Sequence, residues 1–180
     1  LQVVHESAEY MALSVTSIQQ LHSMIYRYHP ENGGQWKHTD NVILEYNNDS
    51  TTTVRFKPLS AAETPEAMET FANNYRRAVD QHGIEPLIAV PLAILDFLCI
   101  HPFSDGNGRM SRLLTLMELY HFDYEVGRYI SLERIIEESK ATYYETLKAS
   151  SQGWHDGEHD PHPWLNYFWG VLLRAYRALE

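Results

Sequence analysis

The stretch His101-Pro-Phe-Ser-Asp-Gly-Asn-Gly-Arg-Met-Ser-Arg112 decides the fold, because it places a tight turn and a helix start between two strongly apolar segments. Asp105, Gly106, Asn107 and Gly108 form a cluster in which glycine and asparagine tolerate positive φ and aspartate or asparagine can cap a helix. We therefore expect a helix that begins at about Asn107. Its first turn would present free backbone N–H groups and the positive end of the helix dipole to an anion.

The charged side chains around this turn suit a phosphate ligand. Arg109 and Arg112, three residues apart, fall on one face of the expected helix and supply two cationic forks for polyphosphate oxygens. Asp105 would repel such an anion unless it holds a divalent cation, so we expect it to bind Mg²⁺ together with substrate phosphates. His101 is the candidate general base, because its ordinary pKa of about 6.5 suits proton removal near neutral pH. Taken singly, each of these features is usually structural, and only their combination points to chemistry.

The same segment resembles the signature of the Fic family, H-x-F-x-[DE]-G-N-G-R-x-x-R, at every defined position. In that family the motif binds Mg²⁺-ATP, and the histidine deprotonates a hydroxyl of a target protein, which attacks the α-phosphate and expels pyrophosphate. The resemblance implies a protein adenylyltransferase with His101 as catalytic base, Asp105 as Mg²⁺ ligand and ATP as co-substrate. The implied nucleotide-binding set is Phe103, Gly106, Asn107, Gly108, Arg109 and Arg112.

Within that set the resemblance assigns different roles. Phe103 anchors the loop in the core, Asn107 cradles the anion with the neighbouring glycine amides, and Arg109 and Arg112 bind the distal phosphates. In the related Doc-type branch a lysine stands at the position of Gly108 and is associated with an inverted nucleotide and phosphate transfer. Gly108 therefore favours nucleotidyl transfer.

Length, charge and cysteine content bound the remaining possibilities. With 180 residues we expect a single domain over 1–180, and since the chain opens on Leu1 we expect a piece of a longer protein. A net charge of −10 argues against nucleic acid as a partner. The apolar segment 86–100 contains Asp96 and is too short to span a membrane. The single cysteine, Cys99, and the lack of a signal peptide favour the cytoplasm.

Apolar spacing predicts a mostly helical chain with one hairpin. Strands are expected at 42–46 and 51–56, on either side of the turn Asn47-Asn48-Asp49-Ser50. Helices are expected at 14–28, 64–81, 85–100, 107–122 and 131–150, and from 160 onward. This order resembles that of Fic proteins, so the expected fold is all-α: a Fic-type helical bundle with a β-hairpin flap beside the nucleotide pocket.

The first expected strand carries the candidate docking residues for a target protein, Val42, Ile43 and Leu44. Alternation places Ile43 on the face opposite its two neighbours, so it is a candidate clamp over the acceptor side chain. Unpaired edge groups of the hairpin could also bind an extended target segment by strand addition. Simple packing of the hairpin on the bundle is an equally open interpretation.

Two segments near the C-terminus are rich in unusual side chains. The run 155–162 is dense in histidine and acidic residues, but its glycines and prolines favour a polar connector over a metal site. In the last helix the spacing of the aromatic residues predicts core packing. The residues expected in that buried face are Trp164, Phe168, Trp169 and Leu172.

Other functions stay open at this point. They are removal of AMP from a modified protein, transfer of another nucleotide or phosphate-linked group, and a non-catalytic nucleotide-sensing or toxin-antitoxin module, which the intact His101 disfavours. Many Fic proteins also resemble one another in an inhibitory helix, [ST]-x-x-x-E-[GN], whose glutamate pairs with the second motif arginine. The chain holds no such match. We therefore expect the pocket to be open and the chain to be uninhibited in cis, with any restraint coming from residues before Leu1 or after Glu180, or from a partner chain.

Overall fold

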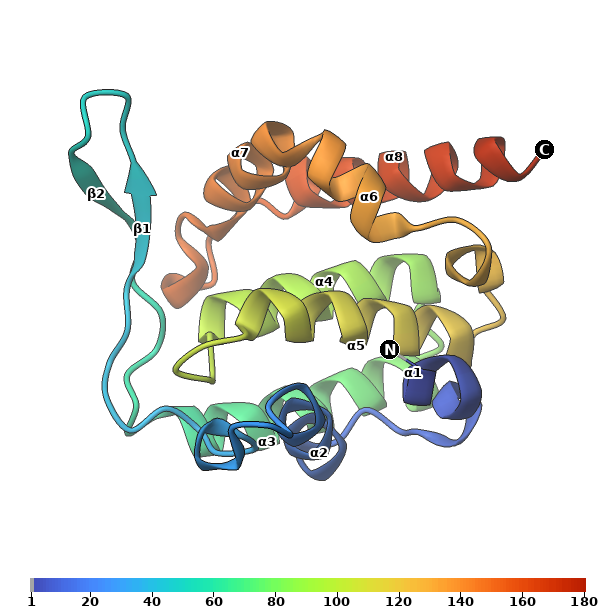
Figure 1. Cartoon of the computed structure of the whole chain (residues 1–180), viewed down its shortest axis with the longest axis horizontal. Coiled ribbons are helices and arrows are strands. Elements are labelled where there is room, and N and C mark those ends of the chain that lie inside the picture. The colour runs from blue at the N-terminus through green and yellow to red at the C-terminus, as the bar shows by residue number, and fades with distance from the viewer. Residues whose placement is uncertain (1) are drawn as a thin grey trace.

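Three layers of helices and one projecting hairpin make up the fold (Figure 1). The computed structural model describes residues 2–180, apart from the side chain at position 9. Two central helices, α4 (Pro86–Ile100) and α5 (Asn107–His121), form the middle layer. One side is covered by α1 (Gln2–Ser7), α2 (Val15–Ile25) and α3 (Thr64–Arg76). The other is covered by α6 (Leu132–Glu138), α7 (Lys140–Ser151) and α8 (His162–Leu179). The expected mostly helical fold is confirmed.

Short helical turns connect the longer elements. They are η1 (Ala8–Tyr10), η2 (Pro30–Asn32), η3 (Arg77–Gln81), η4 (Glu125–Arg128) and η5 (Trp154–Asp156). The η3 turn is a π-helical extension of α3, so the expected helix 64–81 is present in full. The helix α1 was not expected from the sequence.

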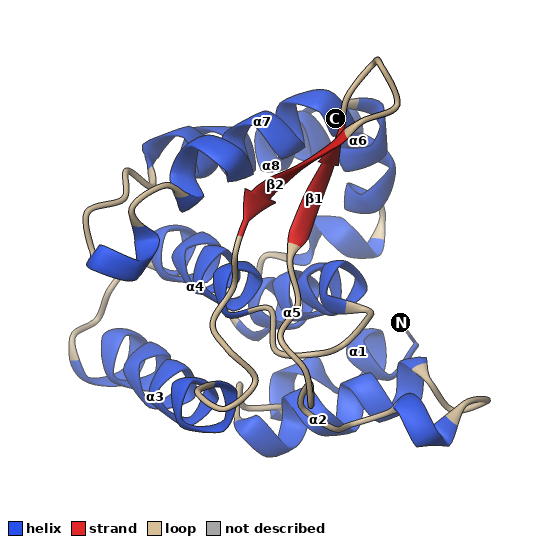
Figure 2. Ribbon diagram, turned by 90° about the vertical axis from the view of Figure 1, so that its left-hand side faces the viewer, coloured by secondary structure: helices blue, strands red, loops and turns tan. Residues whose placement is uncertain are grey.

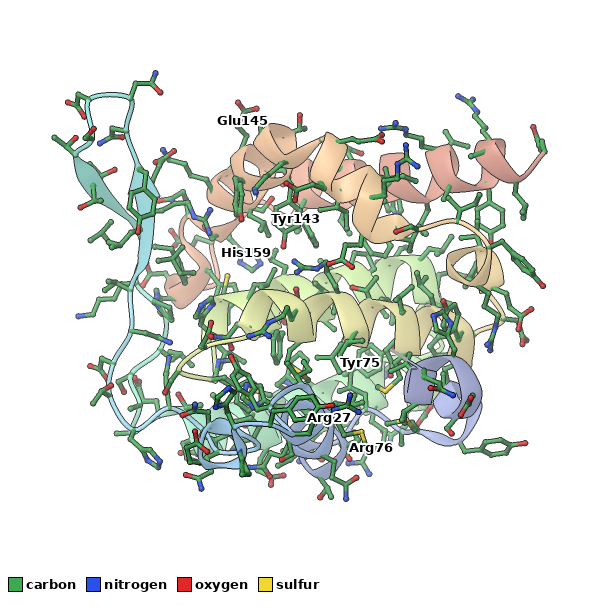
Figure 3. All side chains as sticks on the ribbon, viewed as in Figure 1. Arg27, Tyr75, Arg76, Tyr143, Glu145 and His159 are labelled. Atoms are coloured by element: carbon green, nitrogen blue, oxygen red, sulfur yellow. The ribbon has the colours of Figure 1, made fainter. Side chains whose placement is uncertain are left out.

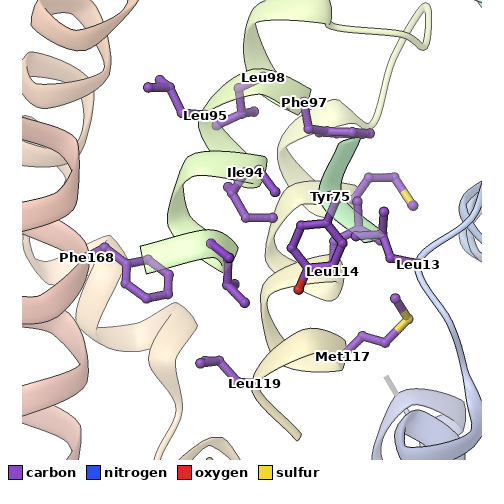
Figure 4. Packing of buried hydrophobic residues seen from close by; sticks show 14 of the residues in the cluster. Leu13, Tyr75, Ile94, Leu95, Phe97, Leu98, Leu114, Met117, Leu119 and Phe168 are labelled. Atoms are coloured by element: carbon purple, nitrogen blue, oxygen red, sulfur yellow. The ribbon is translucent and has the colours of Figure 1, made fainter. Parts of the chain in front are cut away.

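The core lies on both faces of the α4–α5 pair. Ile94 of α4 and Leu114 of α5 lie between Phe168 of α8 on one side and Tyr75 of α3 on the other (Figure 4). Burial from both sides explains why 86–100 is apolar all round instead of amphipathic. Its one carboxyl group, on Asp96, accepts a hydrogen bond from Trp154 Nε1 at 2.8 Å. Within residues 2–180, no helix combines the length and the apolar character needed to cross a bilayer.

The expected helix 131–150 is wrong in one respect, because the structure divides it into α6 and α7 at Ser139. The Ser139 hydroxyl donates to the carbonyl of Ile135 at 2.7 Å and lies 2.8 Å from the hydroxyl of Tyr167. Its backbone leaves the helical region, with φ −114° and ψ 27°. A serine hydroxyl that bonds back to the preceding turn competes with the helical ladder, which accounts for the break.

The hairpin consists of β1 (Ile43–Tyr46) and β2 (Thr52–Phe56), paired antiparallel as expected. Ile43 pairs with Phe56 and Leu44 with Val54, so Arg55 is an extra residue in β2 and forms a bulge. Figure 2 shows the strands in front of the ends of α4 and α5, extending toward α7. One ion pair, Lys148 Nζ to Glu45 Oε2 at 2.6 Å, ties the hairpin to α7.

Most of the aromatic face of α8 is buried, as expected. Trp164, Phe168 and Leu172 are all buried, but Trp169 is 37% exposed, so its assignment to the core is wrong. Trp169 lies at the rim of the bundle, where its indole N–H donates to the carbonyl of Leu87 at 2.7 Å. An amphipathic pattern marks a face of a helix and does not show where the neighbouring helix ends.

Candidate active site

His101 lies directly after α4, at the hairpin end of the molecule. Its backbone is left-handed, with φ 52° and ψ 60°, and its N–H donates to the carbonyl of Phe97 at 2.9 Å. The side-chain Nδ1 lies 3.1 Å from the carbonyl oxygen of Leu98. A carbonyl can only accept, so Nδ1 carries the proton and Nε2 keeps a free lone pair. Burial lowers the pKa of His101 to about 4, so the imidazole is neutral at physiological pH and can accept a proton.

Phe103 and Asn107 hold the loop that follows His101. The Phe103 ring is fully buried and stacks on His22, with ring centroids 3.7 Å apart. The Asn107 side chain accepts from the Phe103 N–H at 2.9 Å and donates to the Phe103 carbonyl at 2.8 Å. Both polar atoms of the Asn107 side chain therefore bond to the loop, and its backbone N–H is the group that it can offer an anion. Phe103 likewise acts as the anchor that the sequence predicted.

His22 of α2 supports this loop, although no pattern in the sequence indicated it. His22 is 1% exposed, and its Nδ1 accepts from the backbone N–H of Gly34 at 3.0 Å. Its Nε2 then carries the proton and donates to the carbonyl of Asp105 at 2.9 Å. Burial lowers the pKa of His22, which keeps this neutral tautomer in place. A neutral histidine from α2 thus fixes the backbone of the expected metal ligand.

Asp105 is held by three donors but stays accessible. Its Oδ2 accepts from the Tyr26 hydroxyl at 2.6 Å and lies 3.5 Å from Arg109 Nη2, while Oδ1 accepts from the N–H of Gly106 at 2.7 Å. The hydrogen bond from Tyr26 is the main reason that the pKa of Asp105 is lowered. Its side chain is 81% exposed. The carboxylate is therefore ionised and open to solvent, as a Mg²⁺ ligand must be.

The start of α5 is shaped to receive an anion. Gly106 has φ +84°, and a Cβ there would lie 3.0 Å from the Tyr26 ring, so glycine is required. Met110 is the first residue of α5 whose N–H is bonded within the helix, to the carbonyl of Gly106 at 2.9 Å. A Cβ on Gly108 would meet Arg112 at 3.6 Å, an ordinary contact. The absence of a side chain at Gly108 thus leaves the helix start open.

A cavity of about 960 Å³ lies between the hairpin, α4, α5 and α7. Three residues of the motif line it, His101, Gly108 and Arg112, whereas Asp105 and Asn107 lie outside it. The hairpin contributes Ile43, Leu44 and the bulged Arg55, and α7 contributes Tyr143 and Tyr144. Val42, the third expected docking residue, does not border the cavity and is 48% exposed. Figure 3 shows Tyr143 between α7 and the central helices, and the Arg55 guanidinium lies 5.1 Å above the Tyr144 ring.

The two arginines of the motif have different surroundings. Arg109 turns toward α2, where its guanidinium donates to the Tyr26 hydroxyl at 2.6 Å. Arg112 borders the cavity, but its Nε lies 3.2 Å from Glu133 Oε1 of α6. Arg112 thus has an acidic partner within the chain although the inhibitory motif is missing, and the expectation that the chain is uninhibited in cis stays a prediction. The spacing of the known inhibitory motif could not reveal Glu133, because this glutamate follows the signature and reaches Arg112 from α6.

A helical domain in which a neutral histidine and the open start of a helix border one cavity, with an ionised carboxylate on the adjoining loop, has features that suit a phosphorylated ligand. Residues 12–119 match the model of the Fic/DOC family, and the chain belongs to that family. Its members are transferases that attach AMP or other groups to proteins.

Solved structures share this fold. The chain is similar to a Fic family protein from Desulfovibrio desulfuricans G20, with TM-score 0.76 and 22% identity over 98% of this chain and 50% of that one. It is also similar to a Fic domain containing signaling protein from Bacteroides thetaiotaomicron VPI-5482, with TM-score 0.77 and 24% identity over 97% of this chain and 65% of that one. BepC, a VirB-translocated effector from Bartonella tribocorum with bound AMPPNP, matches with TM-score 0.59 and 13% identity over 94% of this chain and 82% of that one. The chain thus spans half to two thirds of the first two proteins.

Proposed function

We propose that this domain transfers AMP from Mg²⁺-ATP to a hydroxyl side chain of a protein. The observation that carries the proposal is the free Nε2 of a neutral, buried His101 in the same cavity as Gly108 and Arg112. A base that is neutral at physiological pH and lies beside an anion-binding helix start suits attack of a hydroxyl on a phosphate.

The reaction can be written with the side chains of this chain. His101 Nε2 takes the proton of the acceptor hydroxyl, and the acceptor oxygen forms a bond to the α-phosphorus. The bond between that phosphorus and the oxygen bridging to the β-phosphate breaks, and pyrophosphate leaves. The free N–H groups of Asn107 and Gly108 face the developing negative charge, and Arg112 binds the distal phosphates once Glu133 releases it.

Asp105 is the residue that would hold Mg²⁺. Its exposed, ionised carboxylate retains lone pairs beyond those used by Tyr26 and Gly106, so the donor set fits a hard cation. Bound there, Mg²⁺ supplies charge neutralisation for the phosphates.

Further observations support a nucleotide as the donor and a protein as the acceptor. Gly108 leaves room where the Doc-type branch carries lysine, which favours attack at the α-phosphate. Tyr143 and Tyr144 line the cavity and offer aromatic surface to the nucleobase of the nucleotide. BepC, which shares the fold, is described with bound AMPPNP. Cys99 is buried and reduced, which is consistent with a cytoplasmic location.

Labelled ATP tests this function. The purified protein is incubated with Mg²⁺ and ATP carrying ³²P at the α or the γ position, with candidate target proteins present. We expect protein-bound label from the α position only. Label from the γ position would indicate phosphorylation instead, and release of AMP from a pre-modified protein would indicate the reverse reaction. No label from either position, with ATP bound, would overturn the proposal.

A further inference from the structure

Lys37 is a lysine buried directly behind the catalytic loop. Its residue is 3% exposed, although lysine is among the residues least often found fully buried. Its ammonium group donates to three neutral oxygens: Asn41 Oδ1 at 2.9 Å, the Leu59 carbonyl at 2.6 Å and the Ile100 carbonyl at 3.0 Å. All three N–H donors of the ammonium group are thus satisfied. Among the side chains that the structure describes, no carboxylate forms an ion pair with Lys37.

Those three oxygens belong to three different parts of the site. Asn41 lies just before β1 and Leu59 just after β2, so they mark the two ends of the hairpin. Ile100 is the last residue of α4 and precedes His101. One ammonium group therefore joins both ends of the hairpin to the backbone that carries the base.

The segment around Lys37 also binds the next carbonyls of the loop. The backbone N–H of Lys37 donates to the Pro102 carbonyl at 2.8 Å. The side-chain amide of Asn41 donates to the carbonyls of His101 at 3.3 Å and Phe103 at 3.1 Å. Every carbonyl from 100 to 103 thus accepts from Lys37 or Asn41. An arrangement this complete fixes the loop relative to the hairpin and leaves little freedom between them.

We propose that Lys37 is a positioning residue, whose ammonium holds the hairpin and the His101 loop as one unit so that a target hydroxyl docked on the hairpin meets the base. This inference rests on the proposed function. Burying a charge without an anionic partner is costly, which a purely structural contact would not require. Burial lowers the pKa of Lys37 to about 8, so most of it remains charged at neutral pH. The positive charges of Lys37 and Arg55 lower the pKa of His101, and the negative charge of Asp105 raises it.

The first experiment compares Lys37→Met, Lys37→Arg and the control Lys57→Met. Lys57 is an exposed lysine directly after β2, at the same end of the hairpin as Leu59. Kinetics of AMP transfer are measured with α-labelled ATP and a target protein. We expect Lys37→Met to lower kcat 10- to 100-fold with the KM for ATP changed less than threefold, Lys37→Arg to recover part of the loss, and Lys57→Met to match the wild type. A fall in thermal stability with an unchanged kcat for folded Lys37→Met would overturn the proposal.

If Lys37→Met fails to fold, Asn41→Ala takes its place. It removes the donors to His101 and Phe103 and one of the three acceptors of the Lys37 ammonium, and it leaves the charge of Lys37. We expect the same split, a lower kcat with little change in the KM for ATP. An Asn41→Ala protein that transfers AMP at the wild-type rate would contradict a positioning role for this joint.

Two readouts do not depend on activity, so the inference survives or fails separately from the proposed function. The imidazole of His101 is titrated by NMR, and amide hydrogen exchange is followed in the hairpin and the loop. Loss of the Lys37 charge should raise the pKa of His101, and loss of the joint should speed exchange at least tenfold in both segments together. Faster exchange in the hairpin alone, with an unmoved His101 titration, would show that the two segments are not coupled through Lys37.

Discussion

The loop 101–107 and the hairpin 43–56 border the same cavity but are built in opposite ways. In the loop Phe103 is fully buried, and both polar atoms of the Asn107 side chain bond to the Phe103 backbone. In the hairpin Tyr46 is 80% and Val54 60% exposed, and the contacts to α7 include the Lys148–Glu45 ion pair and Arg55 over the Tyr144 ring. The loop buries its side chains among backbone groups, whereas the hairpin leaves apolar side chains exposed. Under the proposed function, the base lies on a segment with buried side chains and the target docks on one with exposed side chains.

The largest expected effect separates chemistry from binding within the loop. His101→Ala removes the base and leaves the helix start intact, so transfer should fall by about 10²–10⁴-fold while ATP binds as before. Transfer is followed with α-labelled ATP and binding by calorimetry. A variant with the wild-type rate would show that His101 is not the base.

The second prediction tests whether the loop depends on Asn107. Asn107→Ala leaves the buried N–H of Phe103 without a partner, which should lower the free energy of unfolding by roughly 1–3 kcal/mol. Urea denaturation measures this change. The matched control is Asn48→Ala in the exposed hairpin turn, expected to change stability by less than about 0.5 kcal/mol. Equal effects at the two positions would remove the contrast between loop and hairpin.

The hairpin should respond in the opposite sense. Ile43 borders the cavity, and Ile43→Gly removes the candidate clamp without touching the loop. We expect the KM for a protein target to rise about tenfold, a cost comparable to burying one aliphatic side chain, with ATP affinity unchanged. Val42→Gly, outside the cavity, is the control. If Ile43→Gly leaves target kinetics unaltered, the hairpin is only a scaffold.

A smaller effect is expected at the ion pair between Arg112 of α5 and Glu133 of α6. The Glu133 side chain is 72% exposed, and exposed pairs contribute about 0.2–1 kcal/mol. Glu133→Gln should therefore raise ATP affinity about two- to fivefold, and AMP affinity much less because AMP lacks the distal phosphates. Glu137→Gln on the same helix is the control. Equal gains for ATP and AMP would contradict competition between Glu133 and the distal phosphates.

The smallest expected change concerns pH. The proposed reaction requires the neutral form of His101, and its pKa of about 4 means that transfer should vary less than twofold between pH 7.5 and 5.5. An ordinary histidine would lose about tenfold over that range. Between pH 6.5 and 4, His101 is protonated in the unfolded chain and neutral in the folded one. Its contribution to the free energy of unfolding should therefore decrease as the pH falls from 6.5 toward 4. Rates at each pH and urea denaturation check both trends.

The structure of the turn and of its surroundings could be predicted from the sequence because it is local. The turn, the start of α5 at Asn107 and the hairpin follow from residue types that act on their immediate neighbours. The contacts of His22 and Lys37 could not be predicted in this way. His22 bonds to Asp105, 83 positions further along the chain, and Lys37 bonds to Ile100, 63 positions further along. The pairing of Glu133 with Arg112 and the break at Ser139 depend likewise on how α6 packs. A helical pattern indicates which face is buried but not which polar atoms meet across it.

The left-handed backbone of His101 carries a local energetic cost. A histidine held at positive φ costs about 1 kcal/mol or more relative to a glycine, which adopts that conformation freely. The surrounding structure must supply this energy, and the bond from Nδ1 to the Leu98 carbonyl and the burial of the ring are contacts that a glycine would lose. The proposed base is therefore held in a conformation that its own backbone disfavours, which limits the orientations that its ring can adopt.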